Sequence, residues 1–262
     1  GALKLLNVSV PPYVKSGESP RLECSYDSGG DQLYSVSWYK DNEHIYSFST
    51  RNSKRQIFDV EGVRINPRRS NHKDLFLQNV NLDSTGYYAC EVNTDIPPFK
   101  SVKGESLMEV LELPRNKPKI TGVDRIYATG DILSLNCTSD FSHPAAHLQW
   151  FINDVPIEPD SEETMKSRNL YSSRSSLKLQ LSPAHMTQSS IRIKCTSTVQ
   201  TSSLVKQPFR DIRMTEIHDN VFSVEMVALK SGKNNRRKEG KLELPVAQEA
   251  KIQVISVSDS GL

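Results

Sequence analysis

The cysteines and tryptophans of this chain repeat one order along the sequence. They are Cys24, Trp38 and Cys90, followed by Cys137, Trp150 and Cys195, and the chain has no others of either type. In each half the tryptophan follows the first cysteine by 14 or 13 residues, and no cysteine pair has the C-x-x-C spacing of a zinc or redox site. An even number of widely spaced cysteines indicates an oxidising compartment outside the cytosol.

The doubled spacing predicts two immunoglobulin-like sandwiches. In that fold a disulfide joins two strands of opposite sheets through the core, and a tryptophan packs against it. Strand alternation agrees, because Leu22 and Cys24 share one face, as do Ile193 and Cys195. We therefore predict Cys24–Cys90 and Cys137–Cys195 disulfides, in preference to a cysteine nucleophile or a metal ligand.

The segment DSTGYYAC, residues 83–90, adds a second feature of the fold. Tyr88 lies two residues before Cys90, where the tyrosine corner of immunoglobulin domains lies, so its hydroxyl should bond back to the chain. Tyr87 has the opposite parity and should face solvent. The aspartate that many such domains carry six residues before the cysteine is replaced by Ser84.

The predicted fold class is all-β: two tandem immunoglobulin-like β-sandwich domains, variable-type then constant-type, with a partly disordered C-terminal tail. We expect the first domain at 1–113, the second at 114–216 and the tail at 217–262. A turn at Asp41-Asn42 should join strands on either side of it, and the prolines of 114–119 should stiffen the linker. Residues 230–241 carry six basic groups and should be mobile, whereas 250–258 alternate like a strand.

Composition and motifs exclude several classes of function. The net charge of +2 gives no drive toward nucleic acid, and no apolar run reaches the roughly 18 residues that span a bilayer. No signal peptide is visible, so we expect an extracellular form, secreted or attached to the cell surface through a segment not present here. The fragments DSGG and AAH occur in the wrong order for a trypsin-type protease, and Pro144 disrupts a helical His143/His147 metal site. We therefore expect no enzyme, no metal site and no cofactor.

Two N-x-[ST] sequons predict glycan acceptors at Asn7 and Asn136. Asn136 is the better candidate, because its neighbour Cys137 should point into the core and Asn136 therefore to solvent.

Several stretches resemble the beaten path (Beat) family of insect neuronal immunoglobulin-superfamily proteins. The most specific are LYSVSWYK at 33–40 and ELPRNKPKITG at 112–122, and the resemblance covers roughly residues 4–200 by eye. It implies a two-domain adhesion or guidance protein that acts in axon guidance or synaptic targeting. Its expected partner is an immunoglobulin-superfamily receptor of the sidestep (Side) family, which would meet the variable-type domain through one sheet.

Parity predicts which side chains of that sheet face the partner. Because Trp38, Tyr88 and Cys90 should point inward, their neighbours should point outward. On residues 43–49 one of two alternating sets faces out, and Tyr46 and Phe48 are favoured over Ile45 and Ser47. The predicted partner-binding residues are Ser37, Tyr39, Tyr46, Phe48, Tyr87, Ala89 and Glu91.

The alternative function is glycan or proteoglycan binding. Besides the tail, two groups of basic residues could contact heparan sulfate: Arg51, Lys54 and Arg55, and Arg64, Arg68 and Arg69. Such a charge-driven contact would weaken steeply with salt, which distinguishes it from protein recognition.

Overall fold

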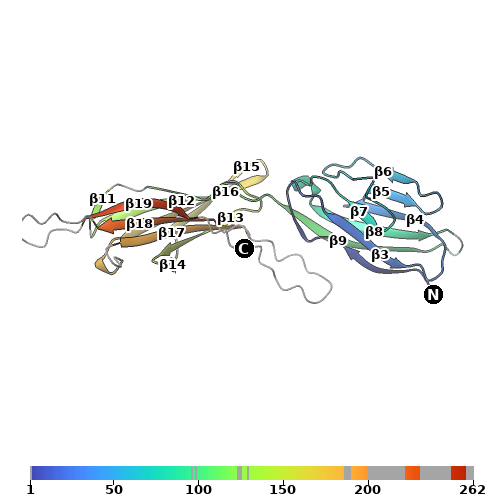
Figure 1. The fold of residues 1–262 in the computed structure, drawn as a ribbon, viewed down its shortest axis with the longest axis horizontal. Coiled ribbons are helices and arrows are strands. Elements are labelled where there is room, and N and C mark those ends of the chain that lie inside the picture. Colours follow the sequence, from blue (N-terminus) through green and yellow to red (C-terminus); the bar gives the residue numbers. More distant parts are fainter. Residues whose placement is uncertain are drawn as a thin grey trace, which may run out of the picture. The chain divides into compact units, whose positions relative to one another are not determined.

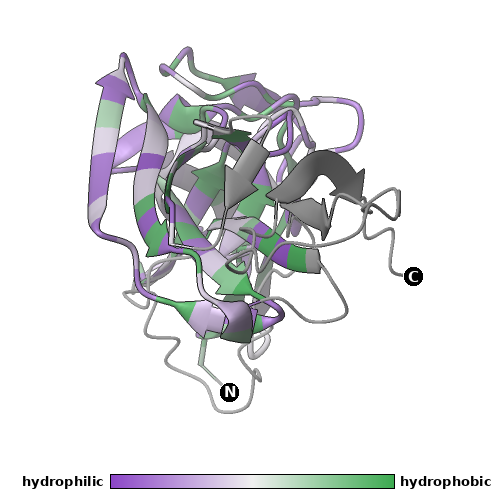
Figure 2. Cartoon of the chain, turned by 90° about the vertical axis from the view of Figure 1, so that its left-hand side faces the viewer, coloured by the Kyte–Doolittle hydropathy of each residue, from purple (hydrophilic) through white to green (hydrophobic). Residues whose placement is uncertain are grey.

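A computed structural model describes residues 2–95, 97, 99–122, 126–128, 130–185, 190–199, 222–230 and 249–257 of the chain. It divides into two compact units between Glu112 and Leu113, and each unit is built from two β-sheets (Figure 1). Along the strands hydrophobic and hydrophilic residues alternate (Figure 2), as expected where one face is buried and the other solvated. The predicted all-β class with two sandwiches is confirmed.

The first domain has a three-stranded sheet of order β1-β3-β7 and a six-stranded sheet of order β2-β9-β8-β4-β5-β6. Neighbouring strands are antiparallel, except that β2 and β9 are parallel. The strands are β1 (Lys4–Ser9), β2 (Tyr13–Lys15), β3 (Arg21–Asp27), β4 (Leu33–Lys40), β5 (Glu43–Ser49), β6 (Arg55–Ile57), β7 (Asp74–Phe76), β8 (Gly86–Thr94) and β9 (Ser101–Leu111). A single-turn 3₁₀ helix, η1 (Leu82–Ser84), precedes β8.

The core of the first domain lies between its two sheets. The Cys24–Cys90 disulfide crosses it, as predicted, and both cysteines and Trp38 are fully buried. Asp41 and Asn42 both have positive φ, 48° and 70°, which is the backbone of a two-residue hairpin turn. The predicted turn between β4 and β5 is therefore confirmed.

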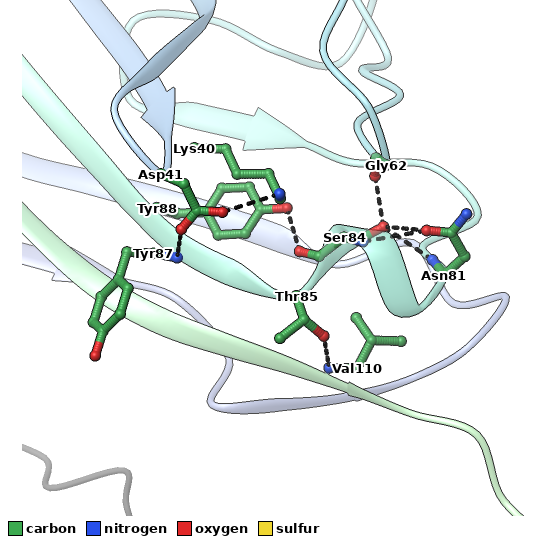
Figure 3. Close-up of polar contacts among 9 residues, drawn as sticks. All are labelled: Lys40, Asp41, Gly62, Asn81, Ser84, Thr85, Tyr87, Tyr88 and Val110. Atoms are coloured by element: carbon green, nitrogen blue, oxygen red, sulfur yellow. Dashed lines mark hydrogen bonds and ion pairs between the residues drawn. The ribbon is translucent and has the colours of Figure 1, made fainter. Parts of the chain in front are cut away.

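The tyrosine corner is also present (Figure 3). The buried Tyr88 hydroxyl donates a 2.7 Å hydrogen bond to the carbonyl oxygen of Ser84, and burial raises the pKa of this phenol. Ser84, which takes the place of the usual aspartate, donates to the Gly62 carbonyl at 2.6 Å and caps η1 together with Asn81. A Cβ on Gly62 would lie 2.3 Å from the Asp83 backbone, so only glycine allows this approach. A hydroxyl and a glycine thus fix the corner without a buried charge.

The second domain has sheets of order β10-β12-β16-β15 and β11-β19-β18-β17-β13-β14. Its strands are β10 (Lys119–Thr121), β11 (Ile126–Ala128), β12 (Ile132–Thr138), β13 (Ala146–Ile152), β14 (Val155–Ile157), β15 (Ser161–Ser167), β16 (Leu170–Gln180), β17 (Ser190–Val199), β18 (Phe222–Lys230) and β19 (Glu249–Val257). A 3₁₀ turn, η2 (Pro183–His185), precedes β17. The predicted Cys137–Cys195 disulfide is present, and Trp150 is buried beside it in the same core.

The expected boundary between the second domain and the tail is wrong for two segments. β18 pairs with β17 along Ser190–Ser197, and β19 pairs with β18, so both complete a sheet of the second domain. The strand predicted at 250–258 exists, but the sequence did not indicate its neighbour, because the partner strand lies across a highly charged stretch. That stretch, predicted to be mobile at 230–241, lies outside the described residues apart from Lys230.

Candidate functional site

The outer face of the first domain is the side of the six-stranded sheet that points away from the core. Strand register places side chains from β9, β8, β4 and β5 next to one another on it. Two adjacent rows cross the sheet: Glu105, Ala89, Tyr39 and His44 in one, and Lys103, Glu91, Ser37 and Ser47 in the other.

Three rings form a stack on this face. The ring of His44 lies 4.8 Å from that of Tyr39, with an interplanar angle of 20°. On its other neighbour, Phe58, the centroid distance is 4.2 Å and the angle 26°. The Lys103 ammonium lies over the Tyr39 ring, 5.0 Å from its centroid, which is a cation–π distance. We call Phe58, His44, Tyr39 and Lys103 the aromatic stack.

A hydrogen-bond network holds the stack in place. The Tyr39 hydroxyl donates to Glu91 Oε2 at 2.8 Å, and Ser101 Oγ donates to Glu91 Oε1 at 2.9 Å. Ser37 and Ser47 join their hydroxyls at 3.2 Å in the neighbouring row. Partial burial and the Glu91 carboxylate raise the pKa of Tyr39 to about 12, so the phenol stays a hydrogen-bond donor near neutral pH. The tyrosine ring is therefore oriented before any partner arrives.

Tyr87 extends the outer face beside the β4–β5 hairpin. Its backbone N–H donates to Asp41 Oδ1 and its carbonyl accepts from the Asp41 N–H, both at 2.8 Å (Figure 3). The same carboxylate pairs with Lys40 at 3.1 Å. These bonds fix the backbone while the Tyr87 side chain stays 52% exposed, pointing away from the buried Tyr88 as parity predicted.

The predicted outward orientation of Tyr46 and Phe48 is wrong. Both are buried core residues, 0% and 8% exposed, and they pair with the inward Trp38 and Val36. The cause is a bulge in β5: Trp38 pairs with Tyr46, but the next residue, Tyr39, pairs with His44, so one residue of β5 is extra.

This bulge reverses the parity along β5 and places His44 on the outer face instead. The sequence analysis missed His44 and Phe58, since neither parity nor composition reveals where a bulge falls. The aromatic run HIYSF was the available signal, but it does not specify which rings point outward.

The remaining predicted contact residues lie on the outer face but differ in exposure. Ser37 and Ala89 are small and buried, 5% and 3% exposed, so they offer little contact area. Tyr39 and Glu91 are partly exposed. A partner could therefore reach the face mainly through the aromatic stack, Glu91 and Tyr87.

Comparison with known proteins agrees with the two domains. Residues 8–108 match the immunoglobulin V-set domain, and residues 118–202 match the CD80-like C2-set immunoglobulin domain. The chain is 30% identical to human cell adhesion molecule 2 over 146 residues, or 55% of this chain and 31% of that protein. It is 26% identical to human junctional adhesion molecule C over 172 residues, or 64% and 53% respectively.

The chain is homologous to immunoglobulin-superfamily cell adhesion molecules. It spans about a third to a half of the length of these curated relatives. The crystal structure of Rst D1-D2 superposes with a TM-score of 0.54 at 18% identity, over 76% of this chain and 92% of that one, which shows a shared fold.

The basic residues proposed for glycan contact are partly engaged within this adhesion-type domain. Arg51 is paired with Asp95, with an N–O distance of 2.5 Å. Arg55 Nε donates to the Ser70 carbonyl at 2.9 Å, and the Arg69 guanidinium lies 4.1 Å from the Phe76 ring centroid. Three of the six charges are therefore held by intramolecular contacts.

The two sequon asparagines lie in different surroundings. Asn7 is exposed on β1. Asn136 is half-buried on the outward side of β12, as parity predicted, and its Oδ1 accepts a 2.7 Å hydrogen bond from Ser176.

Two kinds of feature are missing from the described part of the chain. It holds no group of three or more metal-binding side chains. Among the residues the structure describes, no helix has the length and apolarity to cross a membrane.

Proposed function

We propose that this chain is an extracellular recognition protein, not an enzyme, which binds an immunoglobulin-superfamily receptor through the outer face of its first domain. The resemblance to the Beat family makes a sidestep-family receptor the partner class, and axon guidance or synaptic targeting the process. Homology to cell adhesion molecules supports the class of function.

The observation that carries the proposal is the aromatic stack. Aromatic side chains contribute large contact areas, and their energy is greatest where they need not be ordered on binding. Here the Tyr39 ring is already fixed by His44, Lys103 and the hydroxyl bond to Glu91. Binding therefore costs little side-chain entropy at this position.

Charge gives the face a preferred partner chemistry. The Glu91 carboxylate accepts two hydrogen bonds from its own domain. Lys103 is exposed, and no salt bridge joins it to another described residue. A partner with an acidic group opposite Lys103 and apolar groups opposite the rings would match this surface.

The test is to replace His44 and Tyr87 by arginine, one at a time, and to measure binding to soluble sidestep-family ectodomains by surface plasmon resonance. Each substitution should weaken binding by roughly 30-fold or more, the loss typical of an interface anchor. Leu6→Arg is the matched control, because Leu6 is 59% exposed on β1 of the other sheet. Normal binding by both variants, with circular dichroism unchanged, would place the interface elsewhere.

Glycan binding is distinguished by salt. Protein recognition through the stack should change little between 0.1 and 0.5 M NaCl, whereas a heparan sulfate contact should be lost across this range. Retention on heparin at high salt, with no ectodomain bound, would favour the alternative.

We also propose that Asn136 and Asn7 carry glycans. Both sequons are on outward positions of strands, one in each domain. Mass spectrometry of glycopeptides from insect-cell secreted material should find both modified, and Asn7 more completely, since Asn136 is half-buried. Unmodified Asn136 peptides would contradict the prediction for the second domain.

A further inference from the structure

Tyr34 occupies an irregular position at the start of β4. Leu33 pairs with Thr94 and Ser35 with Asn93, so Tyr34 is skipped in the pairing with β8. A bulge of this kind turns a side chain out of the regular alternation. The Tyr34 ring is 50% exposed, although the strand continues into the buried Val36 and Trp38.

An arginine and an aspartate hold this ring from the two neighbouring loops. Arg51, between β5 and β6, donates from Nε to Asp95 Oδ2 at 2.6 Å and from Nη2 to Asp95 Oδ1 at 2.5 Å. This is the two-pronged geometry that fixes a guanidinium plane. The same guanidinium lies 5.8 Å from the centroid of the Tyr34 ring.

The backbone around the group is also tied down. The Asp95 N–H donates to the Gln32 carbonyl at 2.8 Å, and Thr94 exchanges hydrogen bonds with Lys100 across the base of the β8–β9 loop. Lys100 in turn pairs with Asp31 at 2.8 Å. The loops before β4, after β5 and after β8 are thus linked by two ion pairs.

Charge decides what this group can bind. The side chain of Asp95 is only 7% exposed and that of Arg51 60%, so Asp95 balances the arginine from beneath while the guanidinium face stays open. A neutralised guanidinium beside an exposed tyrosine is a poor site for a sulfated glycan but a good one for apolar or aromatic groups.

We propose that Tyr34 and Arg51, held by Asp95, form a preorganised anchor that binds an apolar or aromatic patch of the partner protein. The inference rests on the proposed function and extends its interface. Tyr34 and Tyr39 lie five residues apart on β4, about 16 Å at 3.3 Å per residue. A standard interface buries about 800 Å² per partner, a disc of about 16 Å radius, so one partner domain can cover both sites.

The experiment is a double-mutant cycle with Tyr34→Ala, Arg51→Met and the double variant, measured against the sidestep-family ectodomains that bind the wild-type chain. Each single change should weaken binding about tenfold or more. The double variant should lose at least about threefold less than the product of the two, because the stacked pair acts as one unit. Arg21→Met is the matched control: Arg21 also bonds to an aspartate, Asp74, but on the other sheet, and should bind normally.

The outcomes separate this inference from the proposal on which it rests. If His44→Arg abolishes binding while all three anchor variants bind like the wild type, the anchor is wrong and the outer face stands. If no ectodomain binds the wild-type chain, the proposed partner class fails. If Arg51→Met elutes from heparin at lower salt than Arg21→Met, Arg51 is a glycan contact, which contradicts a neutral anchor.

Discussion

The two domains bury the same disulfide and tryptophan but surround them differently. In the second domain the Trp150 indole N–H donates to Ser175 Oγ at 2.9 Å. In the first, Trp38 Nε1 is buried and has no hydrogen-bond partner among the described residues. The first core instead gains its internal hydrogen bond from Tyr88, at a position where the second domain has the apolar Ile193.

Serine makes the rest of the difference. Polar groups buried in the second domain are mostly serine hydroxyls that bond to backbone carbonyls, as Ser172 does to Ser139 and Ser173 to Ala146. The first core is closed mainly by large apolar and aromatic side chains, including Tyr46 and Phe48. A shared cysteine–tryptophan frame therefore does not fix how a sandwich satisfies its buried polar groups.

The disulfides should show the largest effect and the smallest difference between domains. Replacing Cys24 and Cys90 by alanine, or Cys137 and Cys195, opens loops of 66 and 58 residues. The chain-entropy model gives about 4 kcal/mol for each loop, with a difference of only about 0.1 kcal/mol. Urea unfolding of the two double variants should therefore show similar losses, and a gap above about 2 kcal/mol would locate the difference in the packing.

Ser175→Ala should reveal the polar character of the second core. It leaves the buried Trp150 N–H without its acceptor, which costs about 1–3 kcal/mol. Ser176→Ala is the matched control, because this neighbour is half-buried and should cost under about 0.5 kcal/mol. Equal stability of both variants in urea would mean that the second core tolerates an unpaired indole as the first does.

Tyr88→Phe is the corresponding test in the first domain. Removing the hydroxyl leaves the Ser84 carbonyl without its 2.7 Å donor and should cost about 1–2 kcal/mol. Tyr87→Phe, at the adjacent exposed position, should change the unfolding free energy by less than about 0.5 kcal/mol. Similar values for the two variants would show that the corner adds no stability.

The smallest effects should come from one carboxylate in each domain. A hydrogen bond from Lys100, then one from the Leu3 N–H, lowers the pKa of Asp31. Burial alone would raise the pKa of Asp140, but hydrogen bonds from the N–H of Phe141 and from Asn116 lower it overall. Because both folded-state pKa values lie below the unfolded ones, the stabilisation is complete above about pH 4 and is lost as pH falls through the folded values.

Asp31→Asn and Asp140→Asn should each lower the melting temperature of their domain by about 1–3 °C at pH 7. The gap to wild type should close toward pH 2, which calorimetry at several pH values can follow. A gap that stays constant from pH 7 to 2 would show that neither carboxylate acts through its charge.

Much of the candidate site could be predicted from sequence, but not its aromatic stack. Alternation placed Tyr39 and Tyr87 on the outer face because pairing runs without interruption from Trp38 and Cys90 to these positions. Tyr46 and Phe48 were misplaced because alternation holds only while register is unbroken, and one extra residue in β5 reverses it.

The sequence by itself determined the two sandwiches, the two disulfides, the corner at Tyr88 and the turn at Asp41-Asn42. These depend on residue types at short or fixed spacings, and local chemistry restricts each of them to few conformations. Only the tertiary structure decided that His44 and Tyr34 face outward, and that β18 and β19 complete the second domain. The physical reason is that bulges and strand neighbours are set by competition among distant segments for the same core and the same backbone hydrogen bonds.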